Sequence, residues 1–170
     1  VDKLNDTSQS HERCSVVEVM GRHAGHIALN TGIATGAIQI ITEEIPTPVE
    51  EIAAHIRKVR ETGKDHFIVI VSEGYGNPVE IAEQIQEMTG IDSRATILGH
   101  IQRGGNPTLR DRVMATQMGY EAVSLLEEGM SNRVVALKGN RIVNYDIHEA
   151  LKMKKGLDMG LYNIMMGTCY

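Results

Sequence analysis

Residues 67–74 read Phe67-Ile68-Val69-Ile70-Val71-Ser72-Glu73-Gly74. The run is apolar on consecutive positions up to Val71, as expected for a strand that is covered on both faces. We therefore predict a buried strand over Phe67–Ser72, with a carboxylate and a glycine just beyond its carboxyl end. Similar runs predict further strands over Cys14–Met20, Ala37–Thr42 and Ala95–Leu98.

Helix signals separate these runs. Thr47-Pro48-Val49-Glu50 and Asn77-Pro78-Val79-Glu80 each combine a capping residue with proline at the first helical position. Thr108 opens a third helix, and residues 134–144 predict a hairpin around Gly139. The predicted inward face of the third helix comprises Val113, Met118, Ala122 and Leu125. Alternating strands and helices predict an α/β fold, a three-layer α/β/α arrangement with a mainly parallel sheet.

The composition excludes several classes of protein. The chain has 170 residues, of which 42% are hydrophobic, and a net charge of −5, which suits one domain or slightly more and argues against nucleic-acid binding. No apolar run approaches the roughly 20 residues of a membrane helix. Cys14 and Cys169 have no metal or redox spacing and predict a reducing, cytoplasmic setting. The histidines show no paired ligand spacing either, so no metal site is predicted.

Charged groups and glycines cluster where strands are predicted to end. Gly21-Arg22, Glu73-Gly74 and the run from Gly99 to Gly105 each follow a strand. Glycine lets the backbone approach a ligand, and the fork of an arginine matches phosphate oxygens. Because Glu73 would repel phosphate, it should face hydroxyl groups. Together these loops predict a site for a phosphorylated polyol at the carboxyl ends of the strands.

Each of these residues also has a purely structural interpretation. Gly21 and Gly25 could allow close packing, Arg13 and Arg94 could be solvated surface charges, and His100 could be a hydrogen-bonded core histidine. In the same way, Met20 would ordinarily belong to the core and Glu73 could pair with an arginine. Spacing alone therefore predicts only a phosphate-binding α/β domain.

Four segments together resemble the bacterial 6-phosphofructokinases in order and spacing. They are Asp6–Arg13, Val17–Arg22, Ser72–Gly74 and Leu98–Gly105. The resemblance covers nearly the whole chain, and it implies a Rossmann-like fold. It further implies that residues 1–107 with about 152–170 form a fructose 6-phosphate-binding domain. The segment of about 108–151 would pack on a separate phosphate-donor domain.

The resemblance also implies roles for individual residues. Glu73 would hold sugar hydroxyls, and Arg22 would stabilise charge on the transferring phosphoryl group as the catalytic residue. His100 and Arg103 would bind the 6-phosphate, which Arg13 and Arg94 would reach from a neighbouring subunit. The implied substrate-binding set is Arg13, Met20, Gly21, Arg22, Glu73, Arg94, His100 and Arg103. Lys64 and His66 would be the remains of a degraded effector site, since the other matching positions hold Asn5, Thr62 and Ile38.

The implied activity is phosphorylation of fructose 6-phosphate to fructose 1,6-bisphosphate in glycolysis, by a cytoplasmic homotetramer with Mg²⁺ and ATP or pyrophosphate. The run Met20–Gly25 slightly favours pyrophosphate. The 170 residues contain neither the family's glycine-rich donor loop nor the stretch with its catalytic base. We therefore expect a piece of a longer enzyme that needs an amino-terminal donor domain, binds no donor or metal by itself and is inactive alone. The alternatives are a stand-alone sugar-phosphate-sensing module, which would not need Arg22, and a structural domain.

Overall fold

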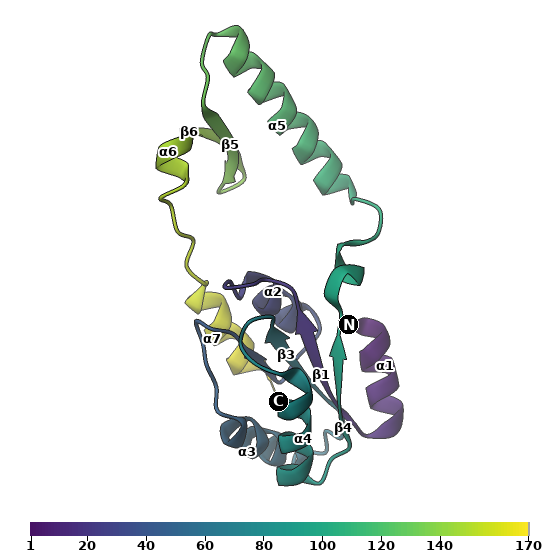
Figure 1. Ribbon diagram of the computed structural model, residues 1–170. Coiled ribbons are helices and arrows are strands. Elements are labelled where there is room, and N and C mark those ends of the chain that lie inside the picture. The colour runs from purple at the N-terminus through teal and green to yellow at the C-terminus, as the bar shows by residue number, and fades with distance from the viewer. Residues whose placement is uncertain (170) are drawn as a thin grey trace. The chain divides into compact units, whose positions relative to one another are not determined.

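The computed structural model describes residues 1–169 and has a four-stranded parallel sheet in the order β2-β3-β1-β4 (Figure 1). The strands are β1 (Cys14–Val19), β2 (Gln39–Ile41), β3 (Phe67–Ser72) and β4 (Ser93–Ile97). Each predicted strand is present, and β3 has the predicted bounds. β2 is shorter than predicted, because the Ala37 N–H bonds to the Gly32 carbonyl and Thr42 turns back onto Ile45.

Three helices connect the strands of the sheet: α2 (His26–Ala34), α3 (Val49–Arg60) and α4 (Pro78–Thr89). α1 (Asp2–His11) precedes β1, and the 3₁₀ helix η1 (Gly99–Arg103) and α7 (Met159–Thr168) follow β4. The sequence patterns did not reveal α1 or α2. Neither helix has a side-chain cap at its start: the N-cap of α1 is Val1 and that of α2 is Gly25.

The predicted caps differ in outcome. The Asn77 side chain accepts a hydrogen bond from the Val79 N–H at 3.0 Å, as expected of an N-cap. The capping box predicted at Thr47 is wrong, since α3 is capped by Pro48 without a side-chain bond. The Thr47 hydroxyl instead accepts a hydrogen bond from Gln39 Nε2 at 3.2 Å.

Two apolar clusters cover the two faces of the sheet. Phe67, Val69 and Val71 of β3 pack with residues of α3 and α4, while Ile68 and Ile70 pack with residues of α2 and α7. Because neighbouring residues of a strand point to opposite faces, the consecutive apolar run of β3 fills both clusters. The three-layer α/β architecture predicted from the sequence is therefore confirmed.

The chain divides into two compact units. Residues 1–104 and the tail from Leu157 form the first unit, and Gly105–Gly156 form the second. The sequence analysis placed this division at 107/108 and at about 151/152; the partner of each unit stays a prediction. None of the helices in residues 1–169 combines the length and apolarity needed to cross a membrane.

The second unit packs α5 (Leu109–Glu127) against an antiparallel hairpin. The hairpin consists of β5 (Arg133–Lys138) and β6 (Arg141–Asp146), and α6 (Ile147–Ala150) follows it. Thr108 and Asp111 form a capping box at the start of α5. The inward face predicted for α5 is partly wrong. Leu125 is buried and Met118 is half-buried, but Val113 and Ala122 are exposed, because the hairpin covers only part of the helix.

Substitution of Ile70 tests the packing of the core in the first unit. Its side chain is fully buried in the middle of β3. We expect Ile70→Ala to lower the free energy of unfolding by about 2–5 kcal/mol, because the substitution leaves a cavity. Urea denaturation measures the change, and Ile164→Ala in α7 is the matched control because Ile164 is 61% exposed. Equal losses in the two variants would contradict this description of the core.

Candidate functional site

The loops that follow β1, β3 and β4 surround one cavity of about 780 Å³. β1 and β3 are neighbours in the sheet, yet α2 and α4, the helices that follow them, cover opposite faces. In open α/β sheets, ligands bind at such a point, outside the carboxyl ends of the strands. The cavity is lined by Met20, Gly21, Arg22, Ile27, Glu73, Gly74, His100, Gln102 and Arg103.

Most of the residues singled out from the sequence meet in this cavity. Glu73 comes from the end of β3, and His100 and Arg103 come from η1. The others are Met20, Gly21 and Arg22, all from the loop after β1. One carboxylate, one imidazole and two guanidinium groups thus share a hollow with an apolar side chain, a set that can bind an anionic ligand bearing hydroxyl groups.

Glu73 connects two of the loops. Its Oε1 atom accepts hydrogen bonds from the N–H groups of Arg22 at 2.9 Å and Gly21 at 3.3 Å. These two bonds, together with the nearby charges of Arg22 and Arg103, hold the pKa of the Glu73 carboxyl below its usual range. The ionised carboxylate has only acceptor oxygens, which suits it to hydroxyl groups that donate hydrogen bonds.

Two positions at the ends of β1 and β3 require glycine: Gly21 in the loop after β1 and Gly74 in the loop after β3. Gly74 has a φ of 96°, and a Cβ at this position would lie 2.9 Å from the carbonyl oxygen of Arg22. At Gly21 a Cβ would lie 2.4 Å from the carbonyl oxygen of Ala24. Arg22 itself is left-handed, with a φ of 50°. Gly74 is therefore required by the close approach of the two loops, and Gly21 by the tight turn within the loop after β1.

Sequence reasoning gave no individual role to Gln102 or Ile27, which also line the cavity. Gln102 connects η1 to β1, since its Oε1 accepts a hydrogen bond from the Met20 N–H at 2.9 Å. Gln102 lies within the run that predicted the phosphate site, so its polarity in a glycine-rich loop was an available signal. Ile27 has no comparable signal, because an apolar residue in a helix usually packs in the core.

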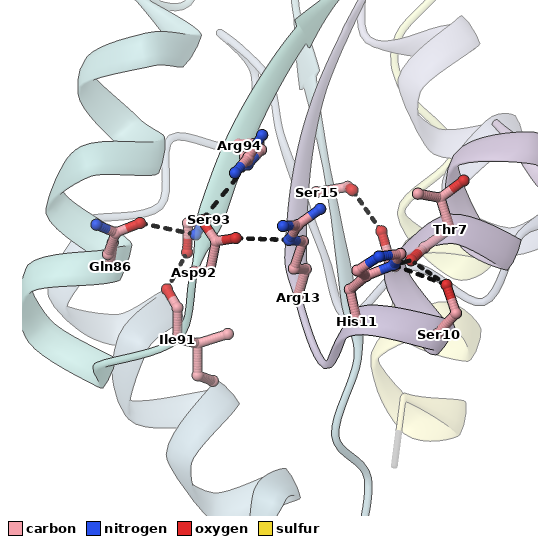
Figure 2. A network of polar contacts seen from close by, with 11 residues as sticks. Thr7, Ser10, His11, Arg13, Ser15, Gln86, Ile91, Asp92, Ser93 and Arg94 are labelled. Atoms are coloured by element: carbon pink, nitrogen blue, oxygen red, sulfur yellow. Dashed lines mark hydrogen bonds and ion pairs between the residues drawn. The ribbon is translucent and has the colours of Figure 1, made fainter.

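Arg13 and Arg94 do not line the cavity. They lie at the edge where the strands begin, which we call the amino edge, and both contact Asp92 (Figure 2). Arg13 Nε donates to Asp92 Oδ2 at 2.5 Å, and Arg94 Nε lies 3.5 Å from Oδ1. Desolvation opposes the charge of Asp92, but the two arginines outweigh it and lower the pKa of the carboxyl. Asp92 was not singled out from the sequence.

The residues predicted as an effector site have ordinary surroundings. His66 Nδ1 lies 2.9 Å from the carboxylate of its neighbour Asp65. Ile38, one of the positions that the resemblance matches to the effector site, is a buried core residue. Lys64 and His66 therefore remain a predicted, degraded site. Across residues 1–169, no three side chains of the His, Cys, Asp or Glu type gather as a set of metal ligands.

The family model for phosphofructokinase matches residues 1–126. The chain belongs to the phosphofructokinase family. Among curated phosphofructokinases, the ATP-dependent 6-phosphofructokinase 1 of Clostridium perfringens is 50% identical over 164 residues, which are 96% of this chain and 51% of that protein. The ATP-dependent 6-phosphofructokinase of Clostridium tetani is 49% identical over 170 residues, 100% of this chain and 53% of that protein. The chain thus spans about half the length of these relatives.

Solved phosphofructokinase structures share the fold. The phosphofructokinase of Saccharomyces cerevisiae superposes with a TM-score of 0.82 at 36% identity, over 89% of this chain and 22% of that one. The T-state phosphofructokinase of Pichia pastoris gives a TM-score of 0.76 at 34% identity, over 89% of this chain and 19% of that one.

Gly74 provides a test of the cavity's geometry. We expect Gly74→Ala to destabilise the protein by about 1–3 kcal/mol, since the new Cβ would be strained at positive φ and would press on the Arg22 carbonyl. Gly76→Ala is the control, because a Cβ at Gly76 would meet nothing within 4 Å. Urea denaturation of both variants measures the difference. If both glycines tolerate alanine equally, the close approach of the two loops is wrong.

Proposed function

We propose that the cavity binds fructose 6-phosphate and that this chain is the sugar-phosphate-binding portion of a 6-phosphofructokinase. The observation that carries the proposal is the meeting of Arg103, His100 and Glu73 in one cavity at the carboxyl ends of β3 and β4. The proposal also draws on the names of relatives about half identical to the chain. The reaction is transfer of a phosphoryl group to the 1-hydroxyl of the sugar phosphate.

The charges in the cavity suit the two ends of such a substrate. Arg103 and His100 donate hydrogen bonds to the 6-phosphate, and hydrogen bonds to charged groups contribute about 1.5–3 kcal/mol each. Glu73 accepts from the sugar hydroxyls. Its Oε1 atom already accepts from backbone N–H groups, so the other oxygen, Oε2, serves the ligand. Met20 and Gly21 form the wall against the sugar ring.

Arg22 acts on the group that is transferred. Its guanidinium stabilises the charge that develops on the phosphoryl oxygens, which makes it the catalytic residue on this chain. The donor is ATP, as in the names of the relatives, rather than the pyrophosphate that the run Met20–Gly25 slightly favours. Carboxylate chemistry for Mg²⁺ does not fit this cavity, because Glu73 is its only carboxylate among residues 1–169 and already accepts backbone bonds. The donor and its metal are held outside this chain.

Arg13 and Arg94 serve the cavity of a neighbouring subunit in a homotetramer. Their position at the amino edge, opposite the cavity of their own chain, favours this assignment. Asp92 contacts both arginines through Nε, which leaves their Nη groups for a phosphate. A planar fork of this kind binds phosphate oxygens in pairs. The assembled enzyme is expected in the cytoplasm.

Arginine variants of the full-length enzyme test the substrate site. We expect Arg103→Ala and Arg94→Ala each to raise the KM for fructose 6-phosphate about 10- to 100-fold, since each removes a hydrogen bond to a dianion. Arg60→Ala, at the exposed end of α3, removes the same charge and should change KM less than twofold. Steady-state kinetics measures all three. An unchanged KM in Arg103→Ala would reject the substrate assignment, and a full-length protein without kinase activity would favour a sensing module.

The isolated 170-residue chain should show no turnover. It has Arg22 but neither a donor loop nor the family's catalytic base among its residues. A coupled assay for fructose 1,6-bisphosphate measures this, with the full-length enzyme as the positive control. Product formation in proportion to the concentration of the pure chain would contradict the proposal that the donor site and the catalytic base lie outside this chain.

A further inference from the structure

The start of α2 is held by a carboxylate from another loop. Gly25 is the N-cap of α2 and has no side chain to cap the helix. Its own N–H donates instead to Glu44, with Oε1 at 3.0 Å and Oε2 at 3.1 Å. Glu44 lies in the loop after β2. A negative charge at this end of a helix also interacts favourably with the helix dipole.

The same two loops touch at further points. A Cβ on Gly25 would lie 2.5 Å from Cγ2 of Thr42, so the helix start is packed directly on the end of β2. Next to Glu44, the carboxylate of Glu43 lies 2.9 Å from Nδ1 of His23. The loop after β2 therefore contacts the segment Gly21–Gly25 both through packing and through two adjacent carboxylates.

Arg22 lies between two anchors. On its amino side, Glu73 accepts the N–H groups of Gly21 and Arg22. On its carboxyl side, Glu44 accepts the N–H of Gly25. A residue other than glycine remains in the left-handed region only where its surroundings impose it, and Arg22 has a φ of 50°. The segment that carries the left-handed Arg22 is therefore anchored on both sides.

Glu44 differs from Glu73 in one respect that matters. Glu73 lines the cavity, whereas Glu44 is not one of the described residues that do. Glu44 therefore acts on the reaction without touching the ligand. Desolvation opposes the charge of Glu44, but the N–H of Gly25 and other hydrogen bonds outweigh it and lower the pKa of the carboxyl. The anchor is thus ionised at neutral pH.

We propose that Glu44 is a positioning residue for phosphoryl transfer: its carboxylate fixes Gly25 at the start of α2 and so sets where Arg22 lies in the cavity. The inference rests on the catalytic role proposed for Arg22. A misplaced Arg22 stabilises the transition state less, while the ground-state contacts of the sugar phosphate with His100 and Arg103 remain.

Variants of the full-length enzyme test this inference. We expect Glu44→Ala to lower kcat about fivefold, the size of a lost N-cap interaction, and to change the KM for fructose 6-phosphate less than twofold. Glu44→Gln keeps an oxygen acceptor for the Gly25 N–H and should restore most of kcat. Glu50→Ala, in the exposed first turn of α3, removes the same charge and is the matched control.

A second arm separates this inference from the proposed function. If Glu44 acts through Arg22, then Glu44→Ala should have no further effect on kcat in an Arg22→Ala background. An equal fivefold loss in both backgrounds would overturn the inference, as would a kcat for Glu44→Ala equal to that of Glu50→Ala. Glu44→Gln as impaired as Glu44→Ala would also overturn it. If Arg22→Ala alone retains full kcat, the catalytic role proposed for Arg22 fails and the inference falls with it.

Discussion

The cavity depends on one interaction, the pair of hydrogen bonds that the Glu73 carboxylate accepts from the backbone of Gly21 and Arg22. A parallel sheet brings the ends of β1 and β3 to the same edge, but it does not fix how the following loops lie. Glu73 does so by bonding directly to the other loop. The cost of ordering this charged side chain is met before any ligand arrives, so the site is organised in advance for binding.

In this mildly acidic chain, the carboxylates and the guanidinium groups near the cavity differ in their bonding partners. Around the loop after β1, three carboxylates bond to the backbone or to a histidine: Glu73 and Glu44 to N–H groups, and Glu43 to His23. Across residues 1–169, no carboxylate forms an ion pair with the guanidinium groups of Arg22 and Arg103, both of which line the hollow. At the amino edge the balance is reversed, since one carboxylate, Asp92, contacts two arginines. The cavity and the amino edge thus each hold a pair of guanidinium groups, whose planar fork matches phosphate oxygens.

The strands and helix starts that depend on a local sequence pattern were the features best predicted from the sequence. The run Phe67–Ser72 has a buried strand's composition, and the Asn77 and Thr108 signals mark real helix starts. α1 was missed because no side chain caps its start. α2 was missed because Glu44, the carboxylate at its start, lies 19 positions from Gly25. Asp92 was missed because its contact with Arg13 joins residues 79 positions apart. The pairing of Gln102 with Met20 joins residues 82 positions apart, a separation that no local pattern can reveal. Which loops end beside each other was predictable, whereas the side chain that links them was not.

The position of α7 has a consequence for folding during synthesis. Met165 is buried against the second face of the sheet, where its sulfur would lie 3.2 Å from a Cβ on Gly32 of α2. This contact belongs to a helix that is translated only after the whole segment Gly105–Gly156. Until then, the apolar side chains on that face of β1 and β3 are incompletely covered. The nascent chain therefore exposes apolar surface that is prone to aggregation while the intervening residues are translated. This is the interval in which chaperones would be needed.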